Sequence, residues 1–385
     1  MVDRSAGLYH AEYLVSERVE RGVLGEATGL AKGDIGMRRI SSRIGFLLAM
    51  LGLVAAGISG AAAQSDQEKS LYDAAKKEGK LTWYTAQFDQ ALATKIGNTF
   101  TQKYPGVQVN VIKATAQVAF QRLLQDIKAG QIQSDVYSTT DMSQFVYLKE
   151  KGELVTYMMP EAEKKIVPAF QNIDPDGYYH VTASGLVAIT YNKEKVKEVD
   201  APKNWTDLTD PKWAGQVAIG DPNYSGMVGV WTVAMAKLYG WDFFSRLNAV
   251  KPLIGRSIDD TVTMLNAGER MVAAGDPAST LRSAAKGNPL GVIYPTDGAV
   301  AIAMPSGIIK NSSSPNAAKL FMEFLLSAEN AKLVSENFEQ SVRSDVVPPP
   351  GAKSLGEVKV VSPTSQEITQ NLPGNKEKWK ETFGM

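Results

Sequence analysis

The feature that most constrains the fold is an alternation of strand and helix patterns that begins at Lys80. Residues 81–84 predict a buried strand, residues 88–103 a helix, and the alternating Val107, Val109 and Val111 a second strand. The chain continues with a helix that starts at Thr115 and ends at Gly130, and with a strand at 135–139. These βαβ units predict a mostly parallel sheet covered by helices on both faces.

A second α/β series begins near Gly185, with strands expected at 186–191, 216–220, 270–274 and 291–294. A chain of 385 residues with 44% hydrophobic and 21% charged residues needs more than one core. We therefore expect a soluble α/β protein with two lobes.

The composition excludes several classes of function. The 41 basic and 41 acidic residues balance, so no net field draws the chain to nucleic acid or to an anionic membrane. Cysteine is absent, which excludes disulfides, thiolate metal sites and cysteine nucleophiles. Only His10 and His180 occur, so the chain cannot build a histidine metal cluster.

The N-terminal region has the pattern of a secretion signal. From Met37, the basic residues Arg38, Arg39 and Arg43 precede an apolar run at 44–58 and the small residues 61–63. We expect cleavage before Gln64, residues 37–63 as the signal peptide, and residues 1–36 as an over-extended start. The alternative is a membrane anchor, but a run of about 15 residues is short for a span of about 20.

In open α/β sheets, ligands bind at the carboxyl ends of the strands. In the first series these ends fall at 85–87, 114–116 and 139–141, which makes Gln87, Thr140 and Asp141 candidate ligand-binding residues. The alternative for each loop taken alone is ordinary surface polarity.

Two helix starts in the second series are further candidates. Tyr224, Ser225 and Gly226 precede an apolar helical stripe, where free backbone N–H groups and the helix dipole favour an anion. Ser225 also fits a plain N-cap. Ser257 and Asp260 resemble a capping box, which leaves Arg256 either free to meet a carboxylate or phosphate, or exposed on the surface.

Four segments carry a resemblance to a known family: residues 80–84, 204–215, 294–300 and 305–326. They resemble the ferric-ion-type branch of family 1 extracellular solute-binding proteins of ABC transporters, and the similarity runs from about Lys80 to Arg343. The resemblance implies a periplasmic, monomeric protein that closes on a small-molecule ligand and delivers it to ABC permease and ATP-binding subunits in the inner membrane.

The resemblance also implies an α/β, two-lobed type II periplasmic-binding-protein fold with a hinge of two crossing strands, near 179–184 and 295–300. Lobe 1 is expected at 64–183 and 298–344, and lobe 2 at 184–297 and 345–385. A helix at 315–338 would belong to the first lobe, and the C-terminal tail would pack on the second.

One departure from the family concerns iron. Ferric-binding members carry adjacent tyrosines after the strand that corresponds to 271–275, whereas this chain has Asp276, Pro277, Ala278 and Ser279 there. We therefore expect no metal and no cofactor, with ferric iron or a ferric chelate as the alternative ligand. Adding Ser184 and Asp276 to the candidates gives a cleft suited to an anionic or zwitterionic solute such as a phosphate ester, phosphonate or carboxylate.

An enzyme is the rival class. After export only His180 could serve as an imidazole base, and no nucleophile-elbow motif accompanies it. Asp259 and Asp260 are adjacent, so on a helix they point about 100° apart and cannot flank one bond. We therefore expect no catalysis. A third class of function is a sensor that uses the same two-lobed fold to present a ligand-dependent surface.

Overall fold

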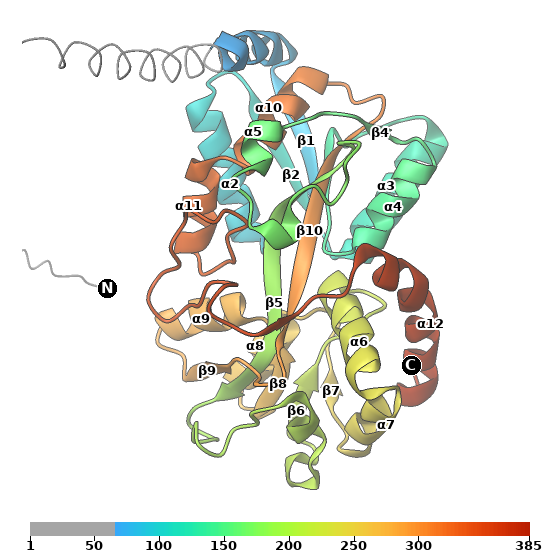
Figure 1. The fold of residues 1–385 in the computed structure, drawn as a ribbon, viewed down its shortest axis with the longest axis vertical. Coiled ribbons are helices and arrows are strands. Elements are labelled where there is room, and N and C mark those ends of the chain that lie inside the picture. The colour runs from blue at the N-terminus through green and yellow to red at the C-terminus, as the bar shows by residue number, and fades with distance from the viewer. Residues whose placement is uncertain (1–65) are drawn as a thin grey trace, which may run out of the picture. The chain divides into compact units, whose positions relative to one another are not determined.

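The computed structural model describes residues 66–385, which belong to one compact unit spanning 61–385. The expected leader at 1–36 and the expected signal peptide at 37–63 lie outside the described residues. Two lobes, each with its own strands and helices, are joined by two long strands (Figure 1). The strand order is β2-β1-β3-β10-β5-β8-β6-β7, with β4 and β11 beside β10 and β9 beside β5.

Lobe 1 contains the first predicted βαβ unit. β1 (Lys80–Thr85) pairs in parallel with β2 (Gln108–Lys113) and with β3 (Val136–Ser138). Between β1 and β2 lies α2 (Gln90–Lys103), whose start is set by Asp89, because its carboxylate accepts a hydrogen bond from the N–H of Leu92 at 2.8 Å. α3 (Ala116–Ala129) ends at Gly130, which adopts a φ of 65° that glycine tolerates best.

Lobe 2 repeats the α/β pattern with shorter strands. β6 (Val217–Ile219) pairs in parallel with β7 (Leu253–Ile254) and β8 (Val272–Gly275), while β9 (Leu290–Ile293) runs antiparallel to β5. Its helices are α6 (Gly226–Tyr239), α7 (Asp242–Ala249), α8 (Asp260–Asn266) and α9 (Pro277–Ala285). The apolar stripe predicted on α6 is core, since Trp231 is 1% exposed and packs edge-on against Phe244.

The connecting strands are β5 (His180–Asn192) and β10 (Ala299–Ile309), which pair antiparallel with each other. The second half of β5 pairs with β8 and β9 of lobe 2, and the end of β10 pairs with β3 of lobe 1. Their mutual register shifts between Met304 and Pro305, where proline lacks an N–H for the ladder. Both connections are therefore strands that run from one lobe into the other (Figure 1).

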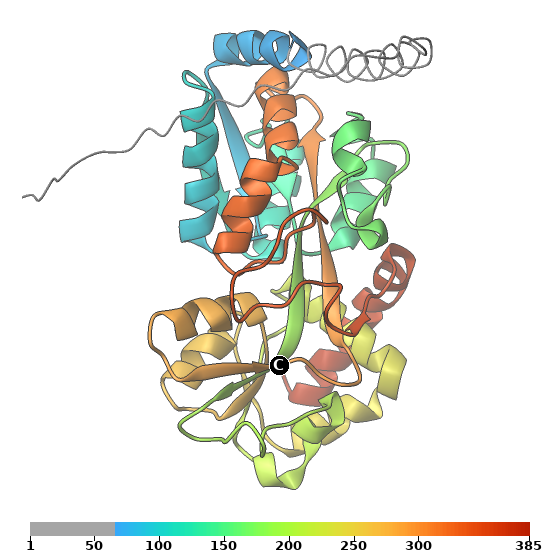
Figure 2. The same cartoon turned by 60° about the vertical axis from the view of Figure 1, so that its left-hand side comes forward.

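The helix expected at 315–338 is two helices, and this part of the prediction was wrong. α10 (Pro315–Leu325) ends before Ser327, whose hydroxyl caps α11 (Ala328–Glu336) by accepting from the N–H of Asn330 at 3.2 Å. The serine thus starts a new helix instead of continuing the first. α10 contacts β1 and α11 contacts α2, as the orange helices beside α2 show (Figure 2).

The C-terminal helix α12 (Ser365–Phe383) contacts both lobes. It begins at a capping box of Thr364 and Glu367 and packs on α6 and α7 of lobe 2. It also contacts α4 (Met142–Glu150) of lobe 1. The remaining short elements are β4 (Leu154–Val155), α5 (Pro160–Glu163), β11 (Val360–Val361) and 3₁₀ turns at Pro168–Phe170, Trp205–Thr209 and Pro211–Trp213.

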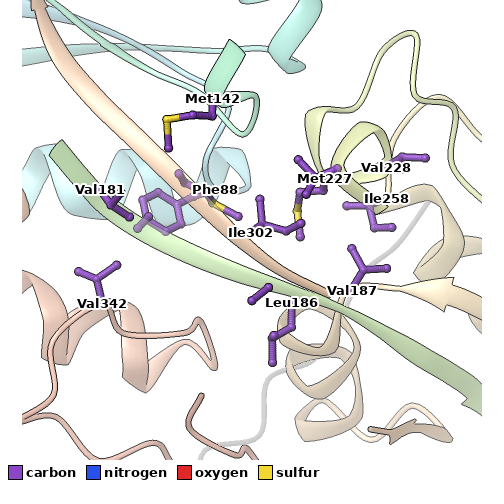
Figure 3. Packing of buried hydrophobic residues seen from close by; sticks show 14 of the residues in the cluster. Phe88, Met142, Val181, Leu186, Val187, Met227, Val228, Ile258, Ile302 and Val342 are labelled. Carbon is purple, nitrogen blue, oxygen red and sulfur yellow. The ribbon is translucent and has the colours of Figure 1, made fainter. Parts of the chain in front are cut away.

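Apolar side chains of both lobes meet around the connecting strands. Figure 3 shows Phe88 and Met142 of lobe 1 on one side and Met227 and Ile258 of lobe 2 on the other, with Ile302 of β10 between them. All five are at most 7% exposed. The two lobes therefore share one continuous apolar core in this conformation. In the part of the chain that the structure covers, no helix is long and apolar enough to cross a membrane.

Candidate functional site

A small cavity of about 40 Å³ lies between the lobes, at the carboxyl ends of the lobe 1 strands and the starts of the lobe 2 helices. Six of the predicted residues line it: Gln87, Thr140, Ser225, Gly226, Ser257 and Asp276. Four others do not: Asp141, Ser184, Tyr224 and Arg256. Thr115, which lies in the predicted strand end 114–116, also lines the cavity, and polar lining residues that were not among the candidates are Asp89, Lys113, Asp259, Ser279, Arg282 and Glu339.

One side of the cavity, the amide side, is made by two helix starts from opposite lobes: Thr115 and Ala116 of α3, and Ser225 and Gly226 of α6. The first turn of each helix leaves backbone N–H groups without intrahelical partners, and each helix start is the positive end of its dipole. Lys113, at the end of β2, adds a cation to the lining. This side can hold an acid group.

The lobes approach each other closely on the amide side. A Cβ added to Gly226 would lie 2.4 Å from Oγ1 of Thr140, so only glycine fits against the lobe 1 loop. Ser225 is the N-cap of α6, with its Oγ 3.5 Å from the N–H of Val228. That is a long bond, so the hydroxyl has capacity left for a ligand.

A second part of the cavity lining, the acidic side, comprises Asp89, Asp259, Asp276, Ser279, Arg282 and Glu339. Asp276 is the N-cap of α9 and accepts from the N–H groups of Ala278 and Ser279 at 3.1 and 2.9 Å. The Oγ of Ser279 lies 2.6 Å from Asp276 and 2.8 Å from Asp259, which joins the two carboxylates. Burial raises the pKa of Asp276 above its ordinary range, although the charge of Arg282 opposes the shift.

Arg282 of α9 reaches across to lobe 1. Its guanidinium donates to Oε1 of Glu339 at 2.5 Å and to the carbonyl of Asn337 at 2.8 Å, and lies 3.5 Å from the carboxylate of Asp89. Burial works against the charged guanidinium, but Glu339 and Asp276 outweigh it and raise the pKa of Arg282. Burial likewise raises the pKa of Glu339 to about 8, even though Arg282 opposes the shift. Arg282 therefore links lobe 2 to lobe 1 through hydrogen bonds and an ion pair.

Asp141 and Ser184 have structural partners outside the lining. Asp141 caps α4, accepting from the N–H of Ser143 at 3.1 Å, and its side chain also accepts from Gln117 at 3.1 Å. The hydroxyl of Ser184 is fully buried in β5 and donates to the carbonyl of Gln340 at 3.3 Å. A ligand role for either residue stays a prediction.

Arg256 and Tyr224 contact each other at the surface. The guanidinium of Arg256, an exposed residue, lies 4.7 Å from the centroid of the Tyr224 ring, which is 37% exposed. The capping pattern beside them forms in part, since the N–H of Ser257 donates to Asp260 at 2.9 Å. The cation is thus engaged with an aromatic face instead of pointing into the cavity.

Of the lining residues that were not predicted, some could have been found from the sequence and others could not. Lys113 directly precedes the loop 114–116 that was singled out as a strand end, so the same rule extended by one residue finds it. Arg282 lies mid-helix and Glu339 follows α11, 57 residues away in the sequence. Nothing in the sequence pattern indicates that these two meet.

Within residues 66–385, no group of three or more His, Cys, Asp or Glu side chains is arranged to hold a metal ion. The cavity lining that the structure describes also contains neither tyrosine nor histidine. The adjacent Tyr178 and Tyr179 pack elsewhere, Tyr179 against Phe145 with ring centroids 5.2 Å apart. His180 is buried between Glu163 and the backbone carbonyl of Tyr157, at 2.6 and 2.8 Å.

The fold is similar to solved periplasmic proteins. A periplasmic binding protein of Actinobacillus pleuropneumoniae, AfuA with exogenous fructose-6-phosphate bound, matches with a TM-score of 0.72 at 23% identity, over 80% of this chain and 99% of that one. Iron-bound HitA of Pseudomonas aeruginosa matches with a TM-score of 0.68 at 22% identity, over 78% and 99%. These matches confirm the two-lobed type II periplasmic-binding fold.

Sequence comparison gives the same class of protein. A probable ABC transporter periplasmic-binding protein of Sinorhizobium fredii is 23% identical over 248 residues, which is 62% of this chain and 68% of the relative. The family model described as bacterial extracellular solute-binding protein matches residues 135–360, more than half of the chain. The chain belongs to the bacterial extracellular solute-binding proteins.

Proposed function

We propose that the protein is the periplasmic solute-binding component of an ABC importer. It closes around a small anionic or zwitterionic organic solute, such as a phosphate ester, phosphonate or carboxylate, and delivers it to the permease and ATP-binding subunits. It works as a monomer and catalyses no reaction. The closing bodies are residues 64–183 with 298–344, and residues 184–297 with 345–385.

The observation that carries the proposal is the convergence of two helix starts on one cavity. α3 comes from lobe 1 and α6 from lobe 2, so an acid group between them gains both sets of N–H contacts only when the lobes close. Lys113 adds charge attraction on the same side. An acid group in the ligand would therefore drive closure.

The acidic side supports a ligand that also carries hydroxyl or amine groups. Carboxylates there would repel a polyanion but accept hydrogen bonds from such groups. Fructose-6-phosphate, bound by the similar protein AfuA, combines a phosphate with hydroxyls. Iron, bound by the similar protein HitA, has less support as the ligand here, because no tyrosine is among the described lining residues.

The size of the cavity supports a clamp that must open. A volume of about 40 Å³ has room for roughly two or three water molecules, far below the 300–1,000 Å³ or so of ordinary ligand pockets. An organic solute therefore enters only after the lobes separate, and the described conformation is a closed one.

Export through the secretion signal completes the proposal. The basic, apolar and small-residue segments at 37–63 support cleavage before Gln64. N-terminal sequencing of protein from the periplasm tests this, with a start at or near Gln64 expected. Recovery of a chain that begins at Val2 or Met37 would contradict it.

The binding role is tested by native mass spectrometry of protein purified from cells, followed by calorimetry with the solute found. We expect a small organic acid. Lys113→Gln should weaken its binding by about tenfold or more, because it removes a charge-assisted contact. The control is Lys128→Gln, at an exposed position in the last turn of α3. A bound solute without an acid group, or equal affinities of the two variants, would overturn the proposal.

A further inference from the structure

Gln87 has a buried amide whose orientation is fixed by its neighbours. Its Nε2 lies 2.9 Å from the carbonyl oxygen of Met304 and 3.1 Å from that of Pro305. It also lies 3.2 Å from each of the hydroxyls of Thr182 and Ser306. Because backbone carbonyls only accept hydrogen bonds, the nitrogen must face them and the amide cannot be turned over.

The other end of this amide has no partner. Oε1 of Gln87 is buried and no donor reaches it from any described residue, while the residue is only 6% exposed and lines the cavity. A buried acceptor without a hydrogen bond is destabilising. A donor supplied by a ligand would satisfy this oxygen.

The acidic side of the cavity also favours a ligand that donates hydrogen bonds. Asp259, Asp276 and Glu339 contribute carboxylates, and a fourth comes from Asp89, two residues after Gln87. The donors nearby are already used, because Arg282 contacts Glu339, Asn337, Ser279 and Asp89. The carboxylates of Asp89 and Asp259 therefore offer acceptors to an incoming group.

We propose that Gln87 and the acidic side make the protein selective for solutes that carry a hydroxyl or ammonium group in addition to the acid group, with Oε1 of Gln87 accepting that group's hydrogen. This rests on the proposed function, because the solute must first bind in the cavity between the lobes with its acid group on the amide side. A solute that has only an acid and an alkyl chain leaves Oε1 unpaired and places methylene groups against carboxylates.

The test is calorimetry of the full mature chain with two pairs of probes that share an acid group and differ in donors. The phosphate pair is fructose 6-phosphate and hexyl phosphate, and the carboxylate pair is gluconate and hexanoate. We expect the hydroxylated member of at least one pair to bind at least tenfold more tightly than its alkyl partner. Inorganic phosphate serves as the probe for the amide side alone.

Gln87→Met provides the matched variant, since methionine keeps the length of the side chain and removes the carbonyl. We expect the preference for the hydroxylated probe to fall several-fold while the affinity for inorganic phosphate stays unchanged. The preference is a ratio measured within one protein, so a general loss of folded material does not alter it. The comparison of probes on the unaltered chain tests the inference even if the variant does not fold.

Three outcomes would contradict the inference, and they separate it from the proposed function. Equal or tighter binding of the alkyl probes overturns the role of Gln87 and leaves an anion-binding protein. Loss of binding on adding a metal chelator shows that the acceptors hold a metal ion instead of a ligand donor. No binding of any probe overturns the proposed function, and this inference with it.

Discussion

At the scale of single residues, Arg282 is the side chain whose removal should cost most. It is 16% exposed and compensates the buried carboxylate of Glu339. At pH 9, above the pKa of about 8 that burial gives Glu339, Arg282→Ala should lower the free energy of unfolding by about 3–5 kcal/mol, because breaking a buried ion pair leaves an uncompensated charge. Urea denaturation followed by fluorescence measures this.

The matched control for Arg282 is Arg246, which pairs with Asp242 one turn away on α7 with both side chains exposed. Arg246→Ala should cost less than about 1 kcal/mol, since exposed pairs contribute little. Equal losses in the two variants would mean that Arg282 is solvated and does not hold the lobes together.

Glu339 should make stability depend on pH. A solvated glutamate has a pKa of 4.5, whereas burial raises the pKa of Glu339 to about 8, so between these values the folded protein binds more protons than the unfolded chain. The free energy of unfolding should therefore fall as pH rises from about 5 to 8, by up to about 1.4 kcal/mol per pH unit.

Glu339→Gln should remove the part of this slope that Glu339 contributes and leave the part due to Asp276, whose pKa burial also raises. Urea denaturation at pH 5 and at pH 8 provides the comparison. If both proteins lose the same stability over this range, Glu339 is ionised throughout and its pKa is not raised.

At the scale of elements, α12 is placed to influence closure without touching the ligand. Nζ of Lys376 lies 3.9 Å from the carboxylate of Asp141, which connects the C-terminal helix to α4 of lobe 1. Lys376→Met keeps the alkyl stem and removes the charge. We expect solute affinity to fall about threefold to tenfold, because the substitution removes an attraction that exists only in the closed state.

Lys380→Met is the control on the same helix, since Lys380 is exposed and pairs only with Glu377 of α12 among the described residues. It should leave the affinity unchanged in calorimetry. A similar loss of affinity in both variants would mean that the net charge of the protein causes it. No loss of affinity in either variant would mean that α12 does not contribute to closure.

The elements themselves were largely predictable from sequence, because alternating apolar periodicity directly reflects burial on sheet and helix faces. The break between α10 and α11 was not, since Ser327 can lie within a helix or cap one and the apolar pattern runs through it. At the site, Gln87 and Thr140 follow from the rule for strand ends, and Ser225 follows from its place at a predicted helix start. Arg282 and Glu339 do not, because their contact exists only once both lobes have folded and come together.

At the scale of the whole molecule, closure on a solute requires two bodies that move about β5 and β10. The closed conformation brings Gly226 of lobe 2 against Thr140 of lobe 1, where a single methyl group would collide. Gly226→Ala should leave α6 intact, because alanine favours helix more than glycine does. It should nevertheless keep the lobes from closing fully.

The most direct test is the distance between the lobes, measured by pulsed electron spin resonance. The chain has no cysteine, so Lys95→Cys on α2 and Val199→Cys, which is 77% exposed in lobe 2, place one spin label on each. When the solute that mass spectrometry identifies is added, the distance between the labels should become shorter in the otherwise unaltered chain. It should also become shorter in a Gly374→Ala control, because a Cβ added at Gly374 meets open space. Gly226→Ala should not shift. A solute-independent distance in the unaltered chain, or full closure of Gly226→Ala, would contradict the clamp.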